Sequence, residues 1–275
     1  MHPYRYFKCA LSRGTFDSCA DGCVVLVMPG RLASCVRRLI ADRPHKRIVL
    51  QINPGARSKP DLADKSPRSD ICHAFCAAFS FARRMAWSRV LVLEDDFFID
   101  PDAEAHAASV AEFVNAVPFH VYNLGRVAFL GWPVSRDHWR AVWHGSAHAV
   151  IYSAEYASAF VGAYRSDPAP VVSAGNDMWW NRPGTLSYVF RRPLAYQVFG
   201  VTENSREWKS GFFVDAAVRA LGLHESHYPG FLVLDALSKS VFWAACLALL
   251  ILVSRLVPPD LRPLLFFDLN AAVRL

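Results

Sequence analysis

Residues 90–100, with the sequence VLVLEDDFFID, constrain the fold more than any other stretch of this chain. The first four residues are all apolar, which is the pattern of a strand buried on both faces of a parallel sheet that helices cover. Three carboxylates, Glu94, Asp95 and Asp96, follow directly. Ionised carboxylates are costly to bury unless they are paired or bind a cation. The segment therefore predicts an α/β fold whose central strand ends in an acidic site.

The three acids have the chemistry of half a metal site. Side chains alternate along a strand, so Glu94 and Asp96 are expected on one face and Asp95 on the other. Carboxylate oxygens are the ligands that Mg²⁺ and Mn²⁺ prefer, and open α/β sheets bind ligands outside the carboxyl ends of their strands. The alternative interpretation is an acidic turn that caps a helix beginning near Pro101.

The segments before this strand predict a βαβ unit. Residues 23–28 and Arg47–Ile52 have strand patterns, and residues 32–41 between them have the apolar spacing of a helix. The right-handed crossover rule then starts a twisted sheet with room for a nucleotide at its carboxyl edge. The absence of G-x-G-x-x-G and G-x-x-x-x-G-K-[ST] argues against a dinucleotide enzyme and a P-loop NTPase.

The segments after this unit continue the alternation of strands and helices. A helix is expected over residues 70–87, with Asp70 as its N-cap. Residues 125–135 and 167–170 contain glycine or proline and are expected to be loops. Further helices are expected at 101–116 and 155–164, and further strands at 119–124, 147–152, 188–190 and 195–198.

Composition limits the classes of partner. The 275 residues are 53% hydrophobic with a net charge of +6, which allows a sizeable core and an acidic partner such as a nucleotide sugar or an anionic membrane surface. The Lys and Arg residues are scattered and no nucleic-acid-binding signature occurs, so no nucleic-acid partner is expected. The seven cysteines are odd in number and form no C-x-x-C pair, which predicts reduced thiols.

The two ends of the chain differ in character from its middle. Residues 1–20 are polar and aromatic without the apolar core of a signal peptide, and are expected to be an extension. Residues 241–253 carry no charge, and the window 238–257 could span a bilayer if Lys239 and Arg255 reach its two interfaces. We therefore expect a main domain over 21–230 and a membrane-associated tail over 231–275. The alternative for the tail is a buried C-terminal helix.

Four motifs occur in an order that resembles a known family. They are Cys72-His73 on a helix, LEDD at 93–96, HGSAHAVIYSAEYASAF at 144–160, and NDMWW followed by PLAYQVFGVTENS ending at Ser205. Together they resemble the glycosyltransferase family that includes bacterial lipooligosaccharide sugar transferases and procollagen galactosyltransferases. The resemblance covers residues 70–205, whereas residues 28–31 (MPGR) only echo the family's N-terminal motif.

The resemblance implies a GT-A-like fold, with a mixed nucleotide-binding sheet and a smaller acceptor-binding part. It implies an inverting transfer of a sugar, such as galactose or another hexose, from a nucleoside-diphosphate sugar to an acceptor hydroxyl. UDP is the expected nucleotide, Mn²⁺ or Mg²⁺ the expected cation, and a glycan, lipid or protein the expected acceptor. With a C-terminal tail, the catalytic domain is expected to face the cytosol.

The resemblance, together with the chemistry of the residues themselves, suggests roles in the site. Asp96 and Glu94 would hold the cation, and His148 would be a third ligand or a donor to the phosphates. Asp177 is the expected base for the acceptor hydroxyl; Trp179 and Trp180 beside it could receive a sugar. The residues expected to contact the donor or acceptor are Asp95, His73, Gln197 and Ser205. The structural alternatives are an N-cap role for Asp177 and ordinary packing for the two histidines.

Two other function classes stay open from the sequence. A different metal-dependent α/β enzyme, such as a phosphotransferase or nuclease, would use the same acids together with others such as Asp137 or Asp215, but neither of these follows an apolar strand. A membrane-tethered binding protein without catalytic activity would keep the fold and lose turnover. The incomplete motif at 28–31 favours this second class, and the intact Glu-Asp-Asp run opposes it.

Overall fold

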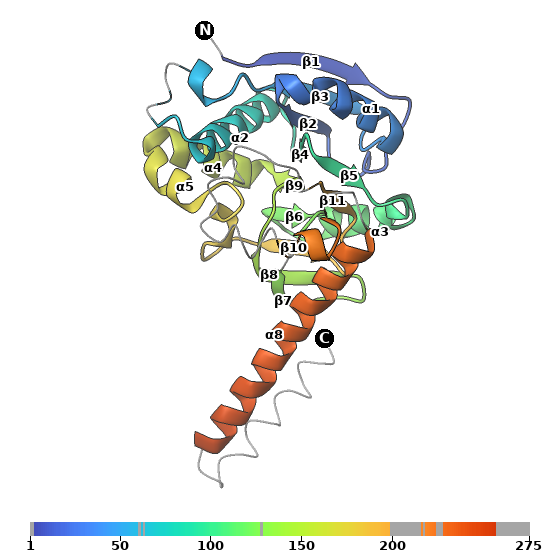
Figure 1. Cartoon of the computed structure of the whole chain (residues 1–275), viewed down its shortest axis with the longest axis vertical. Helices are drawn as coiled ribbons and strands as arrows, with labels where there is room; N and C mark the ends of the chain where they lie inside the picture. Colours follow the sequence, from blue (N-terminus) through green and yellow to red (C-terminus); the bar gives the residue numbers. More distant parts are fainter. Residues whose placement is uncertain are drawn as a thin grey trace. The chain divides into compact units, whose positions relative to one another are not determined.

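The computed structural model describes residues 3–59, 62, 64–126, 129–198, 216, 218–223 and 228–256. The chain forms two compact units, Met1–Asp235 and Ala236–Leu275, and their boundary falls inside the last helix. The first unit is a mixed β-sheet flanked by helices (Figure 1). The predicted α/β class, with a large mixed sheet and an apolar C-terminal helix, is therefore confirmed.

Among the described residues, the main sheet has nine strands in the order β1-β3-β2-β4-β9-β6-β10-β8-β7. β2, β3 and β4 are parallel, and so are β6 and β10, whereas the other neighbours are antiparallel. The bounds are β1 Arg5–Ala10, β2 Gly22–Val27, β3 Arg47–Ile52, β4 Arg89–Glu94, β6 Val121–Asn123, β7 Phe129–Pro133, β8 His138–His144, β9 Ala149–Ser153 and β10 Ser187–Phe190. A second, two-stranded antiparallel ribbon pairs β5 (Phe97–Ile99) with β11 (Ala195–Gln197).

Helices cover both faces of the sheet. α1 (Leu32–Asp42) and α3 (Ala103–Ala116) pack on one face, and α2 (Pro67–Arg84), α4 (Ala154–Ser166) and α5 (Pro168–Ala174) pack on the other. In β4, Leu91 and Leu93 face the first group, while Val90 and Val92 face the second. Burial on both faces explains why this strand is continuously apolar.

Several elements lie where the sequence predicts them. β3 has the predicted bounds Arg47–Ile52, and α1 extends one residue beyond its predicted end. α4 begins after Ser153, whose side chain accepts a hydrogen bond from the backbone N–H of Tyr156. This is the usual N-cap arrangement, and it satisfies one of the free donors at the start of the helix.

The start of α2 differs from the prediction. The N-cap is Ser66, which accepts from the backbone N–H of Ser69, and Pro67 occupies the first helical position. Asp70, the predicted N-cap, is instead a buried residue inside the first turn. A serine followed by proline is a strong start signal, because proline has no N–H to leave unsatisfied there.

Two segments predicted as loops are regular structure. Residues 129–133 form β7, where a β-bulge between Leu130 and Gly131 and the edge position of the strand accommodate the glycine and the proline. A Cβ at Gly131 would approach the carbonyl oxygen of Arg140 to 2.1 Å. Residues 168–174 form α5, which Asp167 caps and whose two prolines, Pro168 and Pro170, lie in the first turn.

All seven cysteines are free thiols, as the sequence predicts. Five of them are buried in the sheet and its covering helices. Burial raises the pKa of Cys19 and Cys72 to about 12, because a thiolate loses its hydration there. These thiols pack as small apolar side chains.

The last described helix, α8 (Tyr228–Leu256), contains the stretch Pro229–Leu249, which is long and apolar enough to span a membrane. Only 6% of that window is buried. The described part of the predicted hydrophobic tail, as far as Leu256, is therefore helical, and the prediction that the tail enters a membrane is taken up below.

The first turns of α8 belong to the first unit. Asp235 accepts a hydrogen bond from the guanidinium of Arg126 at 2.7 Å, and Arg126 is fully buried. The same guanidinium donates to the carbonyl of Phe190 and lies 4.3 Å from the ring centre of Phe129. This pair ties the beginning of α8 to the ends of β10 and β7.

Candidate functional site

The acidic run lies at the carboxyl end of β4, beside the ends of its parallel neighbours. β4 ends at Glu94, and Asp95 and Asp96 form a turn that leads into β5. The predicted alternation of the three side chains therefore holds only as far as Glu94. Arg31 reaches both following acids, at 2.8 Å from Asp95 and 3.9 Å from Asp96, which strict alternation would not allow.

Asp95 joins the ends of two parallel strands. Its Oδ2 atom accepts from the backbone N–H of Met28 at 2.9 Å, and its Oδ1 accepts from Arg31 at 2.8 Å. Its carbonyl oxygen accepts from Arg38 at 3.1 Å. Both carboxylate oxygens of Asp95, which the sequence assigns to donor binding, therefore already accept hydrogen bonds from the protein.

One carboxylate oxygen of Asp96 accepts a hydrogen bond and the other does not. Its Oδ2 accepts from Nε2 of Gln197 at 3.0 Å, so the structure brings together two predicted site residues 101 positions apart. Its Oδ1 is buried and has no hydrogen-bond partner among the described residues. Burial, with repulsion from Asp95, raises the pKa of Asp96 to about 6, against the opposing effects of Gln197 and Arg31.

Glu94 and Asp177 add further negative charge at this place. Burial raises the pKa of Glu94 well above its ordinary value, and the charges of Asp96, Asp177 and Asp95 raise it further. The role of Asp177 as the base stays a prediction. Burial also raises the pKa of Asp177, while hydrogen bonds from its own backbone and that of Ser146 oppose the shift. Carboxylates clustered in this way favour their protonated, neutral forms unless a bound cation takes the place of the protons.

A tight turn holds Asp177. Gly175 has φ 85°, a conformation that favours glycine, and its carbonyl accepts from the N–H of Trp179 at 3.0 Å. Trp180 is buried and stacks on His144 at 4.8 Å between ring centres, and its indole N–H donates to the carbonyl of His144. Trp180 therefore cannot receive a sugar, which corrects that expectation. Trp179 lies under the guanidinium of Arg182.

Ser146 connects the predicted residues and was not found from the sequence. Its Oγ lies 2.6 Å from Nδ1 of His148 and donates to Oε1 of Gln197 at 3.1 Å. Because that hydroxyl has only one hydrogen, Nδ1 of His148 carries the proton of its own hydrogen bond. Ser146 has φ 77°, a strained conformation for a residue with a Cβ, and Asn123 holds its carbonyl.

His148 lies next to the acids in the sheet. Its carbonyl accepts from the backbone N–H of Glu94 at 3.0 Å. Burial lowers the pKa of its imidazole to about 3, so the ring is neutral. A Cβ at Gly125 would come within 2.1 Å of its Nε2 atom, so this nitrogen packs closely against the glycine.

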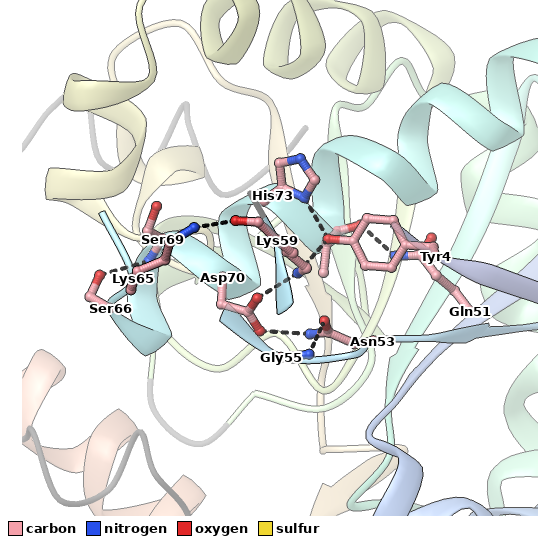
Figure 2. A network of polar contacts seen from close by, with 11 residues as sticks. Tyr4, Gln51, Asn53, Gly55, Lys59, Lys65, Ser66, Ser69, Asp70 and His73 are labelled. Carbon is pink, nitrogen blue, oxygen red and sulfur yellow. Dashed lines mark hydrogen bonds and ion pairs between the residues drawn. The ribbon is translucent and has the colours of Figure 1, made fainter. Parts of the chain in front are cut away.

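His73 lies in a separate polar network at the carboxyl end of β3 (Figure 2). Its Nδ1 lies 2.6 Å from the hydroxyl of Tyr4, which accepts from the buried ammonium of Lys59. Lys59 is also paired with Asp70, whose other oxygen accepts from Asn53 at 2.8 Å. His73 also stacks on the ring of Tyr4, and its predicted contact with the donor stays a prediction. Ser205 lies outside the described residues.

The described residues alone do not complete a metal site. Among them, no group of three or more His, Cys, Asp and Glu side chains is arranged to hold a metal ion. Two surface cavities of about 360 and 320 Å³ lie elsewhere: Asp42 and Arg43 help to line the first, and His120 and Glu155 the second. A cation at the acids would therefore take its remaining ligands from a bound substrate and from water.

Comparison with known proteins gives little further guidance. No family model matches the sequence, and no curated protein matches it. The fold is similar to the crystal structure of a glycosyltransferase involved in the glycosylation of the major capsid of PBCV-1, with a TM-score of 0.39 and 9% sequence identity. The match covers 67% of this chain and 96% of that one. At this level of similarity the likeness identifies neither a donor nor a reaction.

Proposed function

We propose that this protein is a glycosyltransferase that binds a nucleoside-diphosphate sugar through a divalent cation at Glu94 and Asp96. The carrying observation is the group of carboxylates at the carboxyl end of β4, in which Asp95 is buried and Glu94 and Asp96 are half-buried, with the unengaged Oδ1 of Asp96. Loss of hydration, together with the neighbouring carboxylates, raises the pKa of both Glu94 and Asp96. Ligands of open α/β sheets bind at this edge.

The residues present fit a divalent cation in part. Glu94 and Asp96 offer hard carboxylate oxygens, and Mg²⁺ is commonly held by one or two carboxylates together with substrate phosphates. A bound cation would neutralise the charge that develops on the leaving diphosphate. Gln197 fixes the orientation of Asp96, and Ser146 in turn fixes that of Gln197. UDP is the nucleotide that the sequence resemblance favours.

We assign Asp177 as the base that accepts the proton of the acceptor hydroxyl. Its pKa is raised by burial, and a carboxylate shifted toward neutral pH is a more effective proton acceptor. Its charge contributes to the raised pKa of Glu94, which supports a role beside the proposed cation site. The acceptor in this proposal is a hydroxyl of a glycan, lipid or protein.

We further propose that α8 attaches the enzyme to a membrane, with the main unit facing the cytosol. The apolar stretch Pro229–Leu249 and its low burial support the attachment. All seven cysteines are free thiols, which supports a reducing compartment. Proteins of oxidising compartments commonly carry disulfides instead.

A ligand screen on the full chain in mild detergent tests the proposal. UDP, GDP, CMP and ADP are added with and without Mn²⁺, and the thermal unfolding midpoint is recorded. One nucleotide should stabilise the protein only when Mn²⁺ is present. At a nucleotide concentration of 100 times its Kd, the free energy of unfolding should rise by about 2.7 kcal/mol. Stabilisation by Mn²⁺ alone would favour a different metal enzyme, and no shift in a folded sample would favour a protein without catalytic activity.

A further inference from the structure

One helix, α1, contacts the chain on both sides of Asp96. Arg38 donates to the carbonyl oxygen of Asp95 at 3.1 Å. One turn further along α1, Oδ2 of Asp42 accepts from the backbone N–H of Ile99 at 2.9 Å. Residues four positions apart lie on the same face of a helix, so this face of α1 reaches both ends of the segment 95–99.

The contact at Ile99 completes the attachment of β5. On one edge, β5 pairs with β11, where the backbone N–H of Asp100 donates to the carbonyl of Leu194 at 3.0 Å. Successive N–H groups of a strand point to opposite edges, so that of Ile99 points away from β11. Asp42 supplies an acceptor on that side. β5 is therefore held by a strand on one edge and by α1 on the other.

The junction between α1 and β5 depends on this hydrogen bond for its spacing. A cavity of about 360 Å³ lies beside it, and both Asp42 and Ile99 line the cavity. Packing is therefore incomplete on this side, and close packing alone does not fix the distance between the helix and the strand. Ile99 is only 7% exposed, so water has little access to the hydrogen bond.

Asp42 is an unfavourable residue for its place in α1. It is the last residue of the helix, where a negative charge opposes the helix dipole. Burial raises the pKa of its carboxyl, against the lowering effects of the N–H of Ile99 and the charge of Arg38. Both effects oppose stability, and residues that break local rules in this way are expected at functional sites.

We propose that Asp42 is a positioning residue of the acidic site, holding β5 so that the turn before it presents Asp96 to the cation. This inference rests on the proposed function. Asp42 does not touch the cation; it acts through the backbone of Ile99, three residues beyond Asp96. Partners that orient metal ligands in this indirect way commonly contribute 10–100-fold to metal affinity.

Three variants of the full chain in mild detergent test the inference. Asp42→Ala removes the acceptor, whereas Asp42→Asn keeps an oxygen that can accept from Ile99. Asp21→Ala is the matched control, because the carboxylate of Asp21 accepts from the backbone N–H groups of Ser88 and Arg89 at the opposite end of β4. Amide hydrogen exchange measures how firmly the segment 95–99 is held. Electron paramagnetic resonance measures the affinity for Mn²⁺ with and without UDP.

We expect Asp42→Ala to speed exchange in the segment 95–99 by at least about 10-fold and to weaken Mn²⁺ binding by about 10–100-fold. Asp42→Asn should stay close to the original protein in both measurements. Asp21→Ala should speed exchange at residues 88 and 89 and leave Mn²⁺ affinity unchanged, because it loosens the other end of the strand.

Three results would overturn the inference while leaving the proposed function intact. They are Mn²⁺ affinity that Asp42→Ala leaves unchanged, exchange in the segment 95–99 that it leaves unchanged, and a loss of affinity in Asp42→Asn equal to that in Asp42→Ala. Absence of Mn²⁺ binding in the original protein would instead overturn the proposed function, and with it this inference.

Discussion

Replacing Asp96 with asparagine should remove Mn²⁺-dependent nucleotide binding and at the same time make the ligand-free protein more stable. The amide can still accept the hydrogen bond from Gln197, so the turn keeps its shape. The pKa of Asp96 is raised to about 6, so at neutral pH its ionised form opposes folding. Loss of that charge should raise the free energy of unfolding by up to about 3 kcal/mol at pH 7.

The same substitution should weaken Mn²⁺ binding by at least about 100-fold, more than the loss of a residue that only orients a ligand. Thermal unfolding with and without Mn²⁺ and nucleotide measures both effects. Asp177→Asn is the matched control, because it also removes a carboxylate whose charge contributes to the raised pKa of Glu94. It should retain nucleotide binding and lose about 10²–10⁴-fold in sugar transfer. Full cation-dependent binding by Asp96→Asn would contradict the assigned role.

Asp235→Ala should destabilise the first unit by about 3–5 kcal/mol, because it leaves the buried guanidinium of Arg126 without its charged partner. This is a large share of a typical folding free energy of about 5–15 kcal/mol. Chemical denaturation in mild detergent measures the loss. Asp235→Asn should cost less, since an amide oxygen can still accept from Arg126.

The double variant Arg126→Met with Asp235→Leu is the control for this prediction. It removes both charges and keeps apolar volume, so it should recover much of the stability that Asp235→Ala loses. A single Asp235→Ala variant as stable as the original protein would show that the pair contributes nothing. The effect should extend to the site, because Phe231 of the same helix segment packs on Phe98 and Tyr196 of the β5–β11 ribbon, which adjoins Asp96 and Gln197.

The sequence predicts the part of the fold that local patterns determine. Ile48, Val49 and Leu50 and the run into Glu94 are apolar because helices cover both faces of those strands. The position of the acids at the carboxyl edge then follows from the parallel order of β3, β2 and β4. The β7 strand could not be predicted in this way, because its glycine and proline are tolerated only at a bulged edge.

Non-local contacts account for what the sequence does not reveal about the site. Ser146 acquires its role from a positive φ that no neighbouring residue signals. Arg31 contacts Asp95 across 64 positions because it follows β2, which ends beside β4. That contact has a weak sequence signal, since a basic residue just after a predicted parallel strand will lie near the acids at the same edge.

The most direct test of the central claim is a titration of Mn²⁺ followed by electron paramagnetic resonance, with and without the nucleotide that the screen identifies. If the acids and a diphosphate share the cation, the nucleotide should tighten Mn²⁺ binding, and Mn²⁺ should tighten nucleotide binding by the same factor. Affinity should fall as the pH is lowered through about 6, because protons then compete for Asp96. Mn²⁺ binding that is unchanged by every nucleoside diphosphate, or absent at pH 7.5, would contradict the account.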